Sequence, residues 1–284
     1  MEMEIENLYD GARNLGNTIS DMPVGDEDFP FVSVSRFETH AEHALDRTKM
    51  EAILFAPLVR KTLKQKWETF SVANQNWIEE SRAKYLSNLP EESAKPEYLQ
   101  GSISPYVYRR RNNIFPENAT GDEMAPIWYL SPPPFNPGIV NFDMFSQPDY
   151  SEVLDHAVKM NKAEFSRVLN VEQFSSMQVS DADHFRFHEQ YTSLEPGSIG
   201  YDHPHSLYVQ PVVFEKRVVG FVMGAIAWDV YFADLLPTGV FGIHAILNTR
   251  CKDKQDQHFT YELAGAKVSE TTALQMPILV SFPV

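Results

Sequence analysis

The sequence predicts an α+β fold in which an antiparallel sheet packs beside a long helix. Residues 203–263 alternate apolar runs with turn signals, and their order predicts strand, three-residue turn, strand, short helix, strand, loop and strand. Residues 62–89 place apolar side chains at helical spacing. Residues 52–59, AILFAPLV, form an apolar run with the length of a buried strand.

Size and composition describe a folded, acidic protein. The chain has 284 residues, enough for one large domain or two small ones. Hydrophobic residues make up 43% of it and aromatic residues 12%, which excludes a disordered chain. The formal net charge of −15 repels the phosphates of nucleic acids and anionic lipid headgroups. We therefore expect no nucleic-acid partner.

The N-terminal residues 1–28 are polar and acidic, and they lack the basic and apolar regions of a signal peptide. Their apolar residues have a weak helical spacing that ends at Pro23 and Gly25. These residues are Ile5, Leu8, Ala12, Leu15 and Ile19. The stripe is too thin to hold a lone helix in water. We expect a flexible arm or a stalk that pairs with a second copy, giving a weak homodimer.

Two helices are predicted in the first third of the chain. Residues 35–38, SRFE, match the capping-box pattern, and Phe37, Ala41, Ala44 and Leu45 then share one face. Thr62 and Gln65 repeat the pattern at the start of the long helix. The apolar face of this helix consists of Leu63, Trp67, Phe70, Trp77, Ile78 and Tyr85. Asn74 lies on that face and needs a buried partner.

The middle of the chain is rich in proline. Residues 90–138 contain two strand-like islands, at 105–108 and 127–130, and Pro148 begins an amphipathic helix. A polar loop that contains histidines spans residues 175–204.

One apolar segment is almost long enough to cross a membrane. It spans residues 218–236 and contains Asp229 and Asp234. Because a carboxylate is costly within lipid, we expect its first half to be a buried strand and the chain to contain no transmembrane helix.

Seven segments in chain order carry a family resemblance. They are FPFVSVSRFE (29–38), NQNWIEES (74–81), SPYVYR (104–109), PIWYLSPPP (126–134), HPHSLYVQPVV (203–213), VVGFVMGAIAWDVYFADLLPTGVFGI (218–243) and ILNTRC (246–251). Together they resemble the CHASE-like extracellular sensor region of receptor-type guanylate and adenylate cyclases of single-celled eukaryotes. The resemblance divides the chain into a stalk remnant or arm at 1–28, a sensor domain at 29–266 and a tail at 267–284.

The resemblance implies a PAS-like sensing module on the extracellular face of a membrane receptor. In such a receptor two membrane spans flank the module, and a cytoplasmic cyclase domain follows. Those spans and the cyclase chemistry are not expected in this chain, so we expect it to be non-catalytic and without cofactors. We therefore expect the chain to be a fragment, a truncated product or a soluble relative of such a receptor.

A second interpretation is a soluble metal-dependent hydrolase. His184 and His188 stand four residues apart, with carboxylates nearby and His203 and His205 downstream. The HExxH pattern is absent, however, and the single Cys251 excludes a site built on several cysteines. We therefore expect no bound metal. A third interpretation is a scaffold that only mediates association.

A small-molecule ligand, whose identity the sequence does not reveal, is expected between the sheet and its covering loops, where aromatic rings meet hydroxyl and amide groups. The candidate residues are Tyr106, Tyr108, Trp128, Tyr129, Tyr208 and Gln210, and core packing explains the aromatic ones equally well. Residues 109–111, three arginines, hold an anion or form an exposed turn. Asn118 begins a glycosylation sequon, relevant if the chain is secreted.

Overall fold

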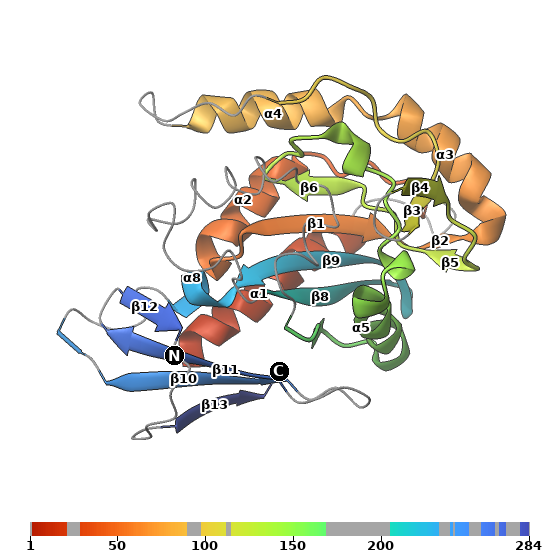
Figure 1. Cartoon of the computed structure of the whole chain (residues 1–284). Coiled ribbons are helices and arrows are strands. Elements are labelled where there is room, and N and C mark those ends of the chain that lie inside the picture. The colour runs from red at the N-terminus through yellow and green to blue at the C-terminus, as the bar shows by residue number, and fades with distance from the viewer. Residues whose placement is uncertain are drawn as a thin grey trace.

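The computed structural model describes the larger part of the chain. The described residues are 2–21, 29–89, 98–111, 115–168, 205–232, 239–240, 242–249, 257–264, 267–270 and 279–283. Helices and mainly antiparallel sheets are combined in them, so the predicted α+β class is confirmed (Figure 1).

A five-stranded antiparallel sheet forms the centre of the fold. Its order is β6-β1-β9-β8-β7. The strands are β1 (Ala52–Pro57), β6 (Tyr129–Ser131), β7 (Glu164–Phe165), β8 (His205–Phe214) and β9 (Arg217–Ala227). Numbered along the chain, the order is 2-1-5-4-3, which agrees with the PAS-like sheet that the resemblance implies.

The hairpin of β8 and β9 confirms the strands predicted on either side of a turn. Glu215 and Lys216 alone form this turn, so the predicted three-residue turn is one residue too long. Both residues have positive φ, 47° and 67°, as a two-residue hairpin turn requires. The first half of the segment 218–236 lies in β9, a buried strand, as predicted. Among the described residues, no helix is both long and apolar enough to span a bilayer.

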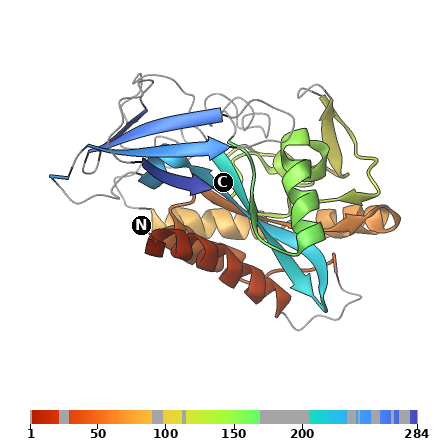
Figure 2. The same cartoon turned by 90° about the horizontal axis from the view of Figure 1, so that it is seen from below.

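Two helices cover one face of the sheet. Helix α1 (Glu2–Ser20) lies across β8 and β9, and α2 (Phe37–Thr48) packs against α1, β1 and β6. Ala12, Leu15 and Ile19 are buried here, so three residues of the stripe that we expected to pair between copies contact their own chain. Figure 2 shows α1 along one side of the sheet and α5 (Pro148–Met160) on the other.

The predicted long helix is two helices, and that expectation was wrong. Helix α3 (Lys64–Ala73), preceded by a 3-10 turn (Lys61–Leu63), ends at Asn74, and α4 (Trp77–Asn88) follows. The side chain of Asn74 donates to the carbonyl of Phe70 over 2.8 Å, which competes with continuation of the helix. Asn74 is exposed and needs no buried partner. Both helices run along the β6 edge of the sheet (Figure 1).

The capping box predicted at residues 35–38 does not form. Arg36 precedes the first residue of α2, has a φ of 56° and makes no side-chain capping bond. The side chain of Glu38 is buried against β6 instead of returning to the helix start. A long-range contact therefore replaces the local one.

Smaller elements complete the fold. Two short ladders pair β2 (Val59–Arg60) with β5 (Glu123–Met124) and β3 (Tyr108–Arg111) with β4 (Phe115–Asn118). Two 3-10 turns (Pro137–Ile139 and Met144–Ser146) lead to α5. After the short helix α8 (Trp228–Phe232), a second sheet has the order β12-β11-β10-β13. It consists of β10 (Ile243–Thr249), β11 (Gln257–Ala264), β12 (Lys267–Glu270) and β13 (Leu279–Pro283). Two of its strands therefore lie in the predicted tail.

Candidate functional site

Four of the six predicted ligand residues fall into two groups at different places on the sheet. Trp128 and Tyr129 lie at β6, whereas Tyr208 and Gln210 lie on β8. Two strands, β1 and β9, stand between β6 and β8, which corresponds to about 14 Å across the sheet. The structure does not bring the two groups into one pocket.

The group on β8 is covered by α1. The ring of Tyr208 lies 5.4 Å from the ring of Tyr9 and 5.1 Å from that of Phe165. Its hydroxyl contacts the side-chain oxygen of Gln210 over 3.2 Å, and the amide of Gln210 donates to the carbonyl of Pro211. These contacts hold α1 on the sheet and satisfy the polar atoms within the chain.

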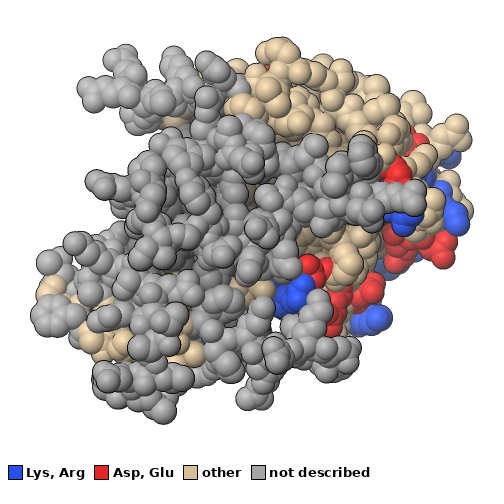
Figure 3. Space-filling model, in the orientation of Figure 1, with Lys and Arg blue, Asp and Glu red and all other residues tan. Residues whose placement is uncertain are grey.

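Several charged side chains of the described structure form ion pairs. Figure 3 shows acidic and basic residues side by side at one end of the molecule. Lys61 contacts Asp122 over 3.3 Å, and Arg109 contacts Glu117 over 2.7 Å across the β3–β4 ladder. Because Arg109 is already paired, it is less available to the anion considered for residues 109–111.

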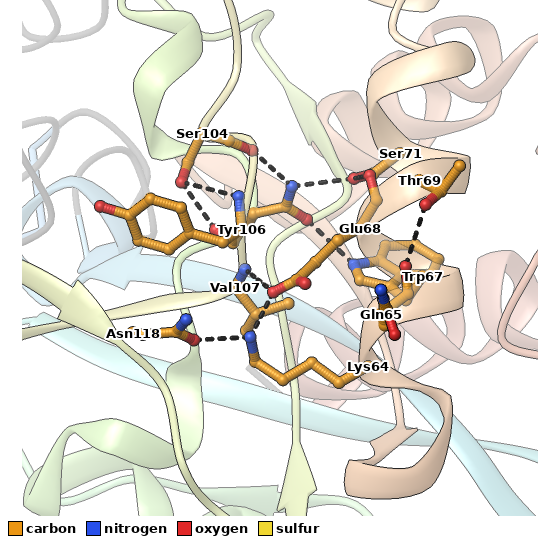
Figure 4. Close-up of polar contacts among 11 residues, drawn as sticks. Lys64, Gln65, Trp67, Glu68, Thr69, Ser71, Ser104, Tyr106, Val107 and Asn118 are labelled. Atoms are coloured by element: carbon orange, nitrogen blue, oxygen red, sulfur yellow. Dashed lines mark hydrogen bonds and ion pairs between the residues drawn. The ribbon is translucent and has the colours of Figure 1, made fainter.

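Tyr106 lies on the segment that packs against α3 (Figure 4), and Tyr108 follows at the start of β3. The main-chain N–H of Val107 donates to Glu68 over 2.9 Å, and the hydroxyl of Tyr108 donates to the carbonyl of Gly138 over 2.8 Å. Lys64 contacts Glu68 and donates to the side-chain oxygen of Asn118 over 2.6 Å. Asn118, in the glycosylation sequon, is exposed.

A buried asparagine that the sequence did not single out holds this region together. Asn141 is 0% exposed, and its amide donates to Ser71 over 2.9 Å and to the carbonyl of Ser104 over 2.8 Å. Its side-chain oxygen accepts the indole N–H of Trp67 over 2.9 Å. The amide therefore joins α3 to two loop segments and has a structural role.

Trp128 and Tyr129 belong to an aromatic cluster between the sheet and α4. The indole of Trp128 donates to the carbonyl of Val32 over 3.1 Å, and the hydroxyl of Tyr129 accepts the N–H of Val34 over 3.1 Å. The ring of Trp77 lies 4.7 Å from that of Tyr129. Burial raises the pKa of Tyr129 to about 12, so this phenol stays neutral. These rings form a wall in which the polar groups of Trp128 and Tyr129 are satisfied.

Beside this wall lies Glu38, a carboxyl group with an incomplete set of partners. It is 6% exposed, and one oxygen accepts the hydroxyl of Ser131 over 2.8 Å. Its other oxygen, Oε2, has no hydrogen-bond partner among the described residues. Burial raises the pKa of Glu38 to about 7. Glu38 of α2 lies here against β6 and α4. We call this group of residues the α2–α4–β6 junction; it consists of Glu38, Ser131, Trp77, Ser81 and Arg82.

Two more junction residues keep a buried donor without a partner in the described part of the chain. Trp77 is 8% exposed, and its indole N–H has no partner there. Arg82 is 4% exposed, and its Nε has none either. The rest of the Arg82 guanidinium is engaged, donating to the carbonyls of Pro134 and Phe135 over 2.9 and 3.0 Å. A buried polar atom without a partner costs about 1–3 kcal/mol. The junction thus contains one buried acceptor and two buried donors that have no partner in the described structure.

Sequence reasoning missed Glu38 and Arg82 as site candidates. Glu38 matched a helix-capping pattern, which gave it a local role. Arg82 follows Ile78 by four residues and therefore lies near the apolar face of α4. A cationic residue near the apolar face of a helix was the sequence signal that could have identified Arg82 as a site candidate.

The predicted metal loop lies mostly outside the described residues, which begin again at His205. The imidazole of His205 contacts the carboxylate of Glu51 over 2.9 Å, and both side chains are buried. Within the described ranges, no group of three or more histidine, cysteine, aspartate or glutamate residues has the geometry to hold a metal ion.

Comparison with known proteins adds no relative. No protein-family model matches the chain, and no curated protein matches it.

Proposed function

We propose that this chain is a non-catalytic sensory domain of a transmembrane signalling receptor of the nucleotide-cyclase type. It binds a small molecule on the extracellular side and changes the output of the receptor. Support comes from the segments that resemble the CHASE-like region and from the order of the strands in the central sheet.

The α2–α4–β6 junction is the observation that carries the proposal. Sites for small molecules combine apolar walls with a few well-placed polar groups. Here the rings of Trp77 and Tyr129 supply the wall, and the Glu38 acceptor and the two donors are buried without partners in the described structure. A ligand with one donor and two acceptors satisfies them.

Such a ligand transmits a signal only if it binds two arrangements of the domain with different affinity. The junction joins α2 to α4, and α2 also packs against α1. We therefore expect the ligand to shift α2 relative to the sheet and to pass this shift to α1.

The test is a thermal-shift screen of small polar molecules with the full chain, followed by calorimetry on each hit. Trp77→Phe keeps an aromatic ring but removes the indole N–H and part of the ring system, so we expect it to weaken binding by about tenfold or more. The matched control is Gln210→Ala, under α1, which leaves the affinity within about twofold. A screen without hits contradicts the proposed function. A hit that depends on Gln210 and not on Trp77 contradicts the assigned site.

A further inference from the structure

We propose that Glu38 is the proton-binding group of a pH switch, in which a neutral carboxyl holds α2 on β6 and α4 and an ionised carboxyl loosens this junction. The proposal adds the proton as an effector. It requires no small molecule, so it stands or fails separately from the proposed function.

The geometry of Glu38 favours the neutral form. A carboxylate is usually buried only with several donors around it, because an unpaired charge is costly away from water. Glu38 has the Ser131 hydroxyl as a donor, the Ser81 hydroxyl lies near enough to lower its pKa, and Oε2 has no hydrogen-bond partner among the described residues. A proton on Oε2 removes the unpaired charge and leaves the bond to Ser131 in place.

The charged neighbours of Glu38 are engaged with other groups. Lys84 of α4 donates to Thr39 over 2.6 Å and contacts Glu42 over 3.1 Å, and Glu42 also accepts from Asn88. Lys84 thus acts on Glu38 only from a distance, and Glu42 of α2 opposes ionisation.

Also on α4, Arg82 contacts Glu79 over 2.9 Å and lies 4.6 Å above the ring of Tyr98. Tyr98 faces Glu38 as a neutral phenol, because burial raises its pKa. No cation of the described structure therefore pairs with Glu38. Ser131 and Ser81, both neutral, are the remaining polar groups close to its carboxyl.

The direction of the switch follows from the raised pKa. Burial lifts the pKa of Glu38 from 4.5 to about 7, so the folded chain holds the proton more tightly than the unfolded chain does. The stability that this proton supplies is complete below pH 4.5 and is lost as the pH rises through about 7. The junction is therefore tight in mild acid and loosened at mildly alkaline pH.

The same helix carries the change to the N-terminal helix. Glu38 lies in the first turn of α2, and Thr48 lies at its other end. A Cβ atom placed on Gly11 of α1 meets the Cγ2 atom of Thr48 at 2.4 Å, so the two helices cross in close contact. Loosening the first turn of α2 therefore alters the support of α1.

The first measurement is the titration of the Glu38 carboxyl by NMR in the unmodified full chain with ¹³C-labelled glutamate. We expect its midpoint near 7, and a midpoint near 4.5 overturns the switch. Hydrogen exchange of the α2 amides, corrected for the intrinsic effect of pH, should increase between pH 6 and pH 8. Unchanged protection of α2 over this range also overturns the switch, because the carboxyl then titrates without loosening the junction.

The second measurement compares melting temperatures across pH 6 to 8 for the chain and two variants. Glu38→Gln keeps an oxygen for Ser131 without the charge, so we expect it to remove the fall in melting temperature over this range, about 2–3 °C. Glu80→Gln makes the same charge change at an exposed position of α4 and retains the fall. Equal slopes for Glu38→Gln and the unmodified chain overturn the proposal.

Discussion

The indole N–H of Trp67 on α3 donates to the side-chain oxygen of Asn141 over 2.9 Å, and both residues are fully buried. The same asparagine has a φ of 73° and uses its amide to donate to Ser71 and Ser104. One side chain therefore fixes α3, the segment before β3 and the segment before α5. Asparagine suits the position because it tolerates positive φ better than most residues.

Replacing this residue tests that role. We expect Asn141→Ala to lower the free energy of unfolding by about 3 kcal/mol, because it leaves buried donors and acceptors unpaired. Urea unfolding followed by tryptophan fluorescence measures the loss. Asn74→Ala, at the exposed end of α3, is the control and should cost less than about 1 kcal/mol. A loss below that value at Asn141 contradicts the role.

The carboxyl of Asp143 makes the stability depend on pH in a different range from Glu38. Burial raises its pKa from 3.8 to about 6, against the opposing bonds from the N–H groups of Ala125 and Phe145. The stability supplied by its proton is present below pH 3.8 and is lost as the pH rises through about 6. Asp143→Asn should remove a fall of about 2 kcal/mol between these values, measured by urea unfolding at a series of pH values. Asp122→Asn, at an exposed side chain, should leave the fall unchanged.

Two glycines of α1 give opposite predictions for the same substitution. Gly11→Ala places a methyl group 2.4 Å from the side chain of Thr48, which forces α1 and α2 apart and costs about 1–3 kcal/mol. Gly16→Ala meets the side chain of Gln210 at 3.5 Å, an ordinary contact, and should gain up to about 1 kcal/mol from helix propensity. Thermal unfolding of both variants checks this contrast. Equal effects of the two variants contradict the close crossing of α1 and α2.

The metal-dependent alternative is tested by elemental analysis of the purified chain. We expect well under one zinc, manganese or iron per chain, because the predicted loop lacks a recognised set of ligands. About one metal ion per chain, lost on His184→Ala, supports the hydrolase instead. Retention of such a metal in the His184→Ala variant places the site elsewhere.

Sequence patterns within a short segment predicted the helices and strands whose ends are set by residues of the same segment. The β8–β9 hairpin follows from two apolar runs around a turn, and α5 begins at Pro148, where the ring fixes a helical φ. The break after α3 was not predicted, because Phe70 and Trp77 continue the apolar face across it. Only the side chain of Asn74, bonded to the carbonyl of Phe70, reveals the end of the helix.

The candidate site was predicted only in part. Trp128 and Tyr129 were named from their residue types, and both lie beside the junction. Glu38 was not named, because its burial depends on Ser131, which is far away in the sequence. Asn141 follows no motif, and its contacts with Trp67 and Ser71 arise only when α3 packs on the loops. Contacts between distant segments thus account for the residues that local patterns missed.

The strand order of the central sheet has a consequence for how the chain is made. The first strand, β1, pairs with β9, so that Ala52 lies opposite Ala225. Pairing of segments that are distant in the sequence slows folding, because the entropy cost of closing a long loop comes before the stabilising contacts form. During synthesis the apolar residues of β1 cannot pair with β9 until β9 has left the ribosome. Nascent chains arrested before residue 217 should therefore be digested by protease, whereas the full chain released from the ribosome should resist it.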